Sequence, residues 1–192
     1  MNCHMPRINE GIRDVVRTHM IYSPTRADML EANHPNACNL CHTDRPIDWT
    51  LQYLKDWYGK TYDESRIAAK SRDRGQAAAL GWLKNDNPAV RLVAAEALMR
   101  AKDGKALPQL LETLDDEYLV NRQFAYKGLQ EMLNVRLADF GYRFYMTKAE
   151  RTTPLEKLRE RLAATRSLRS GALPPIESLR SEDSASRLTG VR

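Results

Sequence analysis

Long hydrophobic runs are absent from this chain of 192 residues. No apolar stretch approaches the roughly 18 residues that a membrane-spanning helix needs, so we expect no membrane span. Residues 1–25 also lack the continuous apolar stretch of about 7–15 residues that marks a secretory signal peptide. Aromatic residues make up only 7% of the chain, while 42% is hydrophobic and 29% is charged, which are ordinary values for a globular protein.

Signatures of common enzyme chemistry are missing as well. The sequence contains no ordered Ser, His and Asp set, no Gly-rich phosphate-binding loop and no carboxylate pair that stands out. The acidic run Asp115–Glu117 is adequately explained by charges at a helix boundary. The net charge of +5 is mild and diffuse, which predicts no nucleic-acid partner. The sequence supports no hydrolase, and we favour a role other than catalysis.

Cysteine and histidine are scarce, yet all three cysteines and all four histidines fall within residues 1–46. Cys38 and Cys41 are separated by two residues, and His42 follows directly. C-x-x-C-H is the attachment signature of a covalent c-type haem (heme c). Each thiol adds across one vinyl group of the porphyrin, and the histidine becomes the proximal ligand of the iron. The sequence therefore predicts thioether sites at Cys38 and Cys41, with His42 on the iron.

A zinc site is the alternative that the same residue types leave open. A reduced C-x-x-C pair can bind zinc or carry out thiol redox chemistry. Cys38 and Cys41 would need two further ligands from the histidines, which are His4, His19, His34 and His42. Adjacent Cys41 and His42 are awkward as two ligands of one tetrahedral ion, so haem remains the favoured prediction.

The first residues match the second half of another haem motif. Cys3 and His4 stand in the order C-H, and the missing first cysteine would lie one residue before Met1. We therefore expect this chain to be the C-terminal part of a longer multihaem protein, with a signal peptide upstream. Covalent haem attachment takes place outside the bacterial cytoplasm, so the expected location is periplasmic or extracytoplasmic. The alternative is that Cys3 is an ordinary free thiol near a frayed terminus.

The haem segment itself predicts little regular structure. Residues 1–46 contain four prolines, and we expect one short helix there, from Ile8 to Met20. Residues 47–58 predict a helix that Gly59 ends. Its apolar stripe is formed by Ile47, Leu51, Leu54 and Tyr58. Trp49 and Trp57 could flank a haem edge, but we favour plain core packing for both.

Residues 63–133 predict pairs of helices, one of which starts at Asn87 with Pro88 in its first turn. Residues 90–98 echo residues 121–129 at a shift of 31 positions. The matched pairs are Arg91 with Arg122, Ala94 with Ala125, and Leu98 with Leu129. A repeat near that length, with small residues where helices cross, is typical of an α-solenoid. We expect a closing helix over 154–168, opened by a capping box at Thr153–Glu156.

The predicted fold class is therefore mainly α, in three parts. Residues 1–60 form a haem-binding segment, residues 61–168 form HEAT-like helical repeats, and residues 169–192 form a disordered tail rich in serine and arginine. An aromatic patch lies before the closing helix, and we expect it to pack over the last repeat rather than to bind a partner. Its members are Phe140, Tyr142, Phe144 and Tyr145.

The order of motifs in the first 60 residues resembles one protein family. Cys3-His4-Met5-Pro6 is followed by His19, then by Pro35-Asn36-Ala37-Cys38 through His42, and then by Trp57-Tyr58-Gly59. This order is similar to the C-terminal part of bacterial extracytoplasmic multihaem c-type cytochromes, in which TPR or HEAT repeats come next. The departure is at the N-terminus, where half a haem motif is absent. The likeness is specific up to about residue 60 and generic beyond it.

The resemblance implies electron transfer through covalent haem. It assigns the thioether bonds to Cys38 and Cys41, the proximal position to His42, and a preceding half-site to Cys3 and His4. His19 matches the family's loop histidine and is the expected distal ligand. The implied partners are redox proteins or neighbouring haem domains. The alternative function is a HEAT-like interaction module that carries a zinc cluster or no cofactor.

Overall fold

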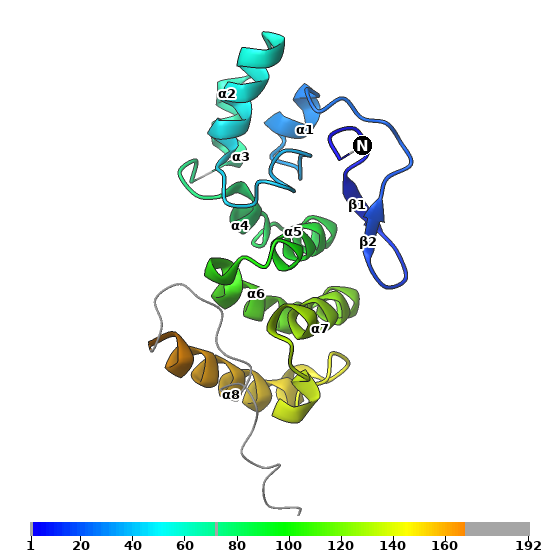
Figure 1. Cartoon of the computed structure of the whole chain (residues 1–192), viewed down its shortest axis with the longest axis vertical. Helices are drawn as coiled ribbons and strands as arrows, with labels where there is room; N and C mark the ends of the chain where they lie inside the picture. Colours follow the sequence, from blue (N-terminus) through cyan, green and yellow to red (C-terminus); the bar gives the residue numbers. More distant parts are fainter. Residues whose placement is uncertain (1, 72, 168–192) are drawn as a thin grey trace, which may run out of the picture.

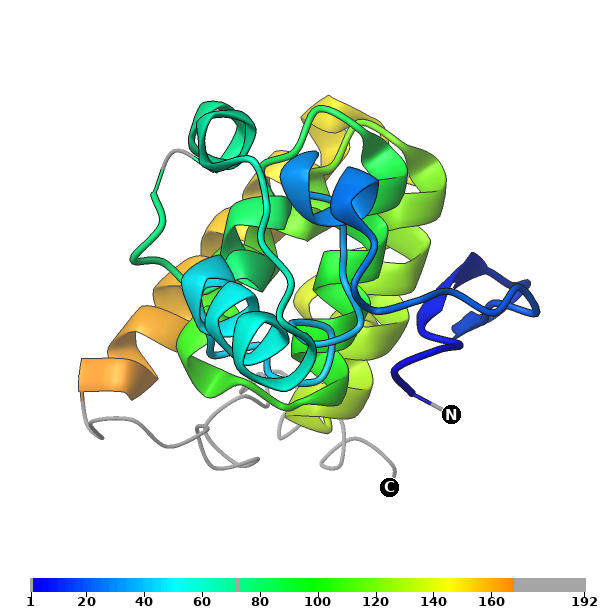
Figure 2. The same ribbon diagram turned by 90° about the horizontal axis from the view of Figure 1, so that it is seen from above.

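The computed structural model describes residues 2–71 and 73–167 and shows a mainly helical chain with one small sheet (Figure 1). The helices stack along the long axis of the molecule, with α2 (Ile47–Tyr58) at one end and α8 (Lys148–Ser167) at the other. The N-terminal strands stand to one side of this stack in both views (Figure 2). The predicted tail at 169–192 lies outside the described residues. None of the described helices is both long and apolar enough to cross a bilayer.

The N-terminal segment folds as a hairpin, so the helix expected from Ile8 to Met20 is wrong. Strand β1 (Arg7–Glu10) pairs antiparallel with β2 (Val15–Arg17). Val15 is fully buried against the helical core, and β-branched residues of this kind favour strands. Gly11 allows the tight connection, since a Cβ there would lie 2.8 Å from the carbonyl oxygen of Asp14.

Three helices surround the haem motif: α1 (Ala27–Glu31), α2 and α3 (Glu64–Lys70). The predicted bounds of α2 are confirmed, and Gly59 ends the helix with a left-handed φ of 62°. The inner stripe of α2 packs with Leu30 and Ile67 into a small core, to which it contributes Ile47, Leu51 and Leu54. Core packing is wrong for Trp57, which is 63% exposed. It lies in the last turn of α2, where Tyr58 of the predicted stripe is exposed as well.

The middle of the chain contains α4 (Ala78–Trp82), α5 (Pro88–Arg100), α6 (Leu107–Glu112) and α7 (Leu119–Leu133). Short 3₁₀ turns follow at Gly104–Ala106, Thr113–Asp115 and Leu137–Phe140. The predicted start of α5 is confirmed, because the Asn87 side chain accepts a hydrogen bond from the Ala89 amide at 2.9 Å. Helices α5 and α7 lie side by side in the centre of the stack.

The 31-residue correspondence is visible in the hydrogen bonds. Arg91 donates to the carbonyl oxygens of Asn85 and Asp86, and Arg122 donates to those of Asp116 and Glu117. Both the donors and their acceptors are thus related by a shift of 31. The matched small and apolar residues Ala94, Ala125, Leu98 and Leu129 are all fully buried. Each arginine therefore ties its helix to the loop before it in the same way.

The closing helix α8 starts six residues earlier than the sequence predicts. Thr147 and Glu150 form the capping box, since the Thr147 amide donates to the Glu150 carboxylate at 2.8 Å. Pro154 lies inside the helix instead of opening it. The expected packing of the aromatic patch is confirmed for Tyr142, which is fully buried and donates its hydroxyl to the Leu114 carbonyl at 2.6 Å. Tyr145 remains 65% exposed.

Buried residues from the first 60 positions and from the later helices share common cores. Val15 and Leu40 belong to the large core of the repeats, whereas Ile67 belongs to the small core around α2. The division into domains at residue 60 stays a prediction. The packing nevertheless places the C-x-x-C-H loop directly on α5, through Leu40.

Candidate functional site

The C-x-x-C-H motif forms one tight helical turn. The amides of Cys41 and His42 both donate to the Cys38 carbonyl, at 3.1 Å and 2.8 Å. Residues spaced at i, i+3 and i+4 lie on the same face of such a turn, so both thiols and the imidazole share a face. Cys38 is half-buried, while Cys41 and His42 are exposed. The three groups that haem attachment needs are therefore together and accessible.

The residue between the cysteines, Asn39, holds the turn from behind. Its side chain is fully buried and donates to the Arg45 carbonyl at 2.9 Å. Its carboxamide oxygen accepts from the Thr50 hydroxyl at 2.7 Å and from the Asn36 side chain at 3.0 Å. Because each polar atom of this buried group is satisfied, the loop has one preferred conformation.

Leu40 and the surrounding loop attach the turn to the helical stack. Leu40 is 3% exposed and packs in the large core. Its carbonyl accepts a hydrogen bond from the Arg100 guanidinium at 3.2 Å. On the other side of the loop, the Trp82 indole donates to the Asn33 side chain at 2.9 Å. The two residues between the cysteines thus anchor the motif, and its reactive groups remain at the surface.

The thiols of the haem segment lie close to one another. All three cysteines are reduced. Burial, and then the neighbouring thiols of Cys3 and Cys41, raise the pKa of Cys38 from 9.0 to about 11. Cys3 and Ala37, the residue before Cys38, also line one small pocket together. The structure therefore brings the half-motif at Cys3 next to the complete motif.

The histidines are less well gathered than the cysteines. His42 stays with the turn, while His4 makes a hydrogen bond of 3.0 Å through Nδ1 to the Tyr22 carbonyl. His19 and His34 are exposed, and no hydrogen bond of the described residues joins the His19 ring to the turn. The role of His19 as a distal ligand stays a prediction.

A row of aromatic rings starts at His42, a feature that sequence reasoning missed. The His42 ring lies 4.7 Å from Trp49, which lies 4.7 Å from Tyr53, and Tyr53 lies 5.0 Å from Trp57, as measured between ring centroids. Arg45 stands over the Trp49 ring at 6.0 Å. The spacing i, i+4, i+8 along α2 was the available signal. Trp49 is the nearest neighbour of His42 in this row.

No zinc-type ligand set is assembled in the part of the chain that the structure describes. Within residues 2–71 and 73–167, no three Cys, His, Asp or Glu side chains converge as a metal site would require. The alternative of a zinc cluster therefore gains no support from the geometry.

Comparisons with protein-family models, with curated proteins and with solved structures find no match.

Proposed function

We propose that this protein is an electron-transfer protein that carries a c-type haem on Cys38, Cys41 and His42. The observation that carries the proposal is the turn itself, in which two thiols and one imidazole share an accessible face. The buried side chains of Asn39 and Leu40 fix that face. This is a donor set suited to thioether attachment and axial ligation, and it differs from a closed four-ligand metal site.

Each residue of the turn has a distinct task in this proposal. Cys38 and Cys41 would hold the porphyrin through thioether bonds, and the imidazole of His42 would bind the iron. The high pKa of Cys38 keeps its thiol protonated at neutral pH, which disfavours thiolate ligation of a metal. A bound haem would supply one-electron chemistry at a potential that its second axial ligand sets.

The neighbouring residues would tune and orient the proximal ligand. Trp49 contacts the His42 ring, and Arg45 stands over Trp49, so a cation and an aromatic face adjoin the imidazole. We expect His19 to supply the second axial ligand, as the resemblance implies. Two histidines would fill both axial positions and leave no open site, which favours electron relay over substrate chemistry.

The helical part would serve as a scaffold or docking surface of the HEAT-like type. The equivalent roles of Arg91 and Arg122 and the small buried residues between α5 and α7 support this proposal. The expected partners are redox proteins or neighbouring haem domains. The location would be periplasmic, where haem maturation takes place.

Expression behind a periplasmic signal, together with haem-maturation factors, tests the proposal. We expect a covalent c-type absorption spectrum, a haem-stained band on a denaturing gel, and an intact mass that shows one haem. Cys38→Ala combined with Cys41→Ala should remove all three signals. Cys3→Ala is the matched control, because it removes a thiol of the same region and leaves the complete motif.

A colourless protein that is folded and helical would contradict the proposal. Metal analysis of that protein would then separate the two alternatives. Bound zinc would favour an adaptor with a Cys/His cluster, and its absence would favour an interaction module without cofactor. Retention of haem in the double alanine variant would also contradict the assignment of the two cysteines.

A further inference from the structure

Three arginine side chains line one small pocket beside the C-x-x-C-H turn. Arg7, Arg17 and Arg100 share this pocket of about 50 Å³ with Cys41 and Leu40, and no acidic residue lines it. The arginines come from β1, from β2 and from the last turn of α5. Guanidinium groups that converge from three elements without an acid among them would repel one another.

Backbone carbonyls hold the three guanidinium groups in place. Arg7 donates to the Val15 carbonyl at 3.1 Å, and Arg17 donates to the Met5 carbonyl at 3.3 Å. Arg100 donates to the Leu40 carbonyl at 3.2 Å. Each of these bonds uses one N–H of a guanidinium group, and the group has five N–H donors in all. Further donors therefore remain available in a fixed geometry.

The charge of the pocket is only partly balanced. Arg100 pairs with Glu96 at 2.9 Å, whereas Arg7 and Arg17 form no ion pair with any described residue. The second carboxylate oxygen of Glu96 is buried and makes no hydrogen bond, and no ion pair joins Glu96 to Arg7. Three cations and one anion leave two positive charges in excess. An anionic ligand with carboxylate or phosphate oxygens would remove this excess.

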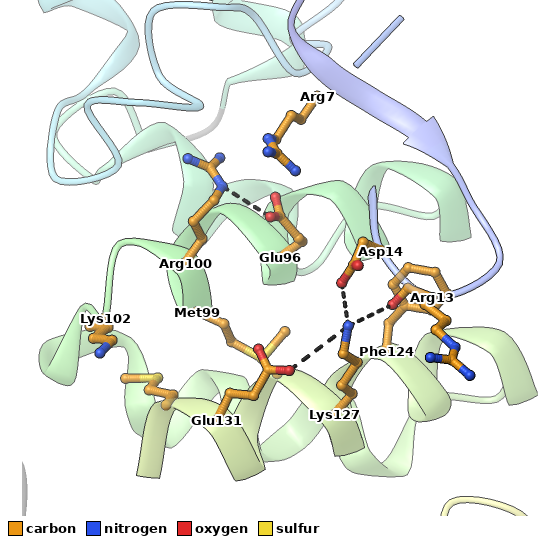
Figure 3. Close-up of a pocket in the computed structure, with 12 residues that line it drawn as sticks. Arg7, Arg13, Asp14, Glu96, Met99, Arg100, Lys102, Phe124, Lys127 and Glu131 are labelled. Carbon is orange, nitrogen blue, oxygen red and sulfur yellow. Dashed lines mark hydrogen bonds and ion pairs between the residues drawn. The ribbon is translucent and has the colours of Figure 1, made fainter. Parts of the chain in front are cut away.

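A wider cleft gives access to the pocket. The cleft of about 510 Å³ lies between the hairpin and helices α5 and α7, and it shares Arg7 and Arg100 with the pocket. Figure 3 shows these two side chains reaching toward the same space from the strand and from the helix. Lys127 on its far side is paired with Asp14, which ties the hairpin to α7. Arg13, Lys102 and the acidic Glu131 also line this cleft, so the excess of positive charge belongs to the small pocket.

We propose that Arg7, Arg17 and Arg100 form a binding site for an oxyanion, either a carboxylate or a phosphate group, next to Cys41. Two sources have this chemistry. One is a propionate of a haem attached to the neighbouring cysteines, and this source alone rests on the proposed function. The other is a free dianion such as phosphate or a small dicarboxylate. The anion site itself stands on the geometry of the three arginines.

The first arm of the test uses the haem-free chain of residues 1–192. Inorganic phosphate and succinate are titrated separately, with sodium chloride at matched ionic strength as the control for screening. NMR signals of the arginine side chains and the melting temperature are followed. We expect saturable shifts at Arg7, Arg17 and Arg100 and a rise in melting temperature with phosphate or succinate, but not with chloride.

Matched variants then assign the binding to the pocket. Arg17→Gln and Arg7→Gln should each raise the Kd for phosphate about tenfold or more, because a charge-assisted hydrogen bond is lost. Arg17→Lys should have an intermediate effect, since it keeps the charge and loses the planar fork. Arg159→Gln is the control, because Arg159 on α8 pairs with Glu112 and lines neither the pocket nor the cleft, and its Kd should match that of the wild type. Far-UV circular dichroism verifies that each variant is folded.

The second arm uses the haem-loaded protein and distinguishes the sources. If a propionate occupies the pocket, phosphate no longer shifts the arginine signals, and Arg17→Gln lowers the midpoint potential of the haem while Arg159→Gln leaves it unchanged. If phosphate still binds, the ligand is a free oxyanion. The proposal is overturned if neither anion binds the haem-free chain and Arg17→Gln leaves the potential unchanged. A chain that fails to load haem refutes the proposed function only, since the first arm still decides the anion site.

Discussion

The two residues between Cys38 and Cys41 are more deeply buried than the cysteines themselves. Asn39 and Leu40 are buried, whereas Cys41 and His42 are exposed. A motif written as C-x-x-C-H leaves these two positions free, but in this chain they anchor the turn. The buried carboxamide of Asn39 joins three separate parts of the loop. The accessible face therefore depends on side chains that take no part in the chemistry.

The three cysteines should differ in reactivity before haem is attached. Burial raises the pKa of Cys38 to about 11, which lowers its thiolate fraction about a hundredfold relative to a thiol with a pKa near 9. We expect iodoacetamide at pH 8 to label exposed Cys3 and Cys41 at least about tenfold faster than Cys38, as measured by peptide mass spectrometry.

Because burial in the folded state slows the labelling of Cys38, the control is to repeat the labelling in urea. In the unfolded chain all three cysteines should react at similar rates, since the burial of Cys38 is lost. Labelling of Cys38 as fast as Cys41 in the folded protein would show that its thiol is neither buried nor raised in pKa. The turn would then be open rather than packed.

At the scale of elements, the clearest repeated interaction is an arginine, Arg91 or Arg122, that donates hydrogen bonds to the carbonyls of the loop before its helix. Arg91 also binds both carboxylate oxygens of Asp116, at 2.8 Å and 3.0 Å. Burial alone would raise the pKa of Asp116, but the hydrogen bonds from Arg91, Tyr118 and Asn121 outweigh it and lower the pKa. The side chain of Asp116 is only 6% exposed, so this pair joins α5 to the start of α7 within the packed stack.

Removal of the charge from Asp116 should destabilise the protein at neutral pH. We expect Asp116→Asn to lower the free energy of unfolding by about 2–3 kcal/mol, because a buried partner of Arg91 is lost. A lowered pKa contributes stability above the ordinary aspartate pKa, and this contribution disappears as the pH falls. The difference between wild type and variant should therefore be largest above about pH 4 and shrink below it. Urea denaturation over a pH series measures both effects.

Asp28→Asn is the matched control, because Asp28 forms an exposed pair with Arg26. Its substitution should leave the free energy of unfolding unchanged. Equal losses in the two variants, or a loss at Asp116 that does not depend on pH, would show that the buried pair does not stabilise the stack.

The elements also show where local sequence determines structure and where it does not. Helix α2 was predictable, because a continuous apolar stripe and Gly59 act in the same direction. The hairpin was not, because the apolar residues between Ile8 and Met20 fit a short helix as well as paired strands. Its strands depend on the burial of Val15 against a distant helix.

The start of α8 illustrates the same limit. Thr147–Glu150 and Thr153–Glu156 both have the spacing of a capping box, and Pro154 favours the second as a helix start. The structure uses the first, and the extra turn carries Arg151, which is 6% exposed and paired with Asp115. A contact across 36 residues thus decides between two local signals that sequence alone leaves nearly equal.

At the scale of the whole molecule, the C-x-x-C-H turn and the helical stack share one core. The C-x-x-C-H motif was predictable from adjacent residues. The arginine pocket was not, because it combines positions 7, 17 and 100, which only the docked hairpin brings together. The point of contact that makes this possible is Leu40, since it belongs both to the motif and to the large core.

Leu40 should therefore be required for the stability of the helical stack as well as of the C-x-x-C-H turn. We expect Leu40→Ala to lower the free energy of unfolding by about 2–4 kcal/mol, as for other buried leucines. A probe of the helical stack and a probe of α2 should report the same decrease. Helical circular dichroism reports mainly on the stack. In a Trp82→Phe background, which removes the tryptophan buried in the large core, the fluorescence of Trp49 and Trp57 reports on α2 beside the motif. If the parts share one core, both signals should follow a single cooperative transition in urea, shifted to lower concentration.

Leu119→Ala is the matched control, because that leucine is 48% exposed at the start of α7 and should cost little. Two separate transitions, with only the fluorescence signal shifted by Leu40→Ala, would show that the haem segment folds independently of the repeats. A single shifted transition would instead mean that the haem turn cannot open without loosening α5. Haem loading and the stability of the helical scaffold would then be coupled through one buried side chain.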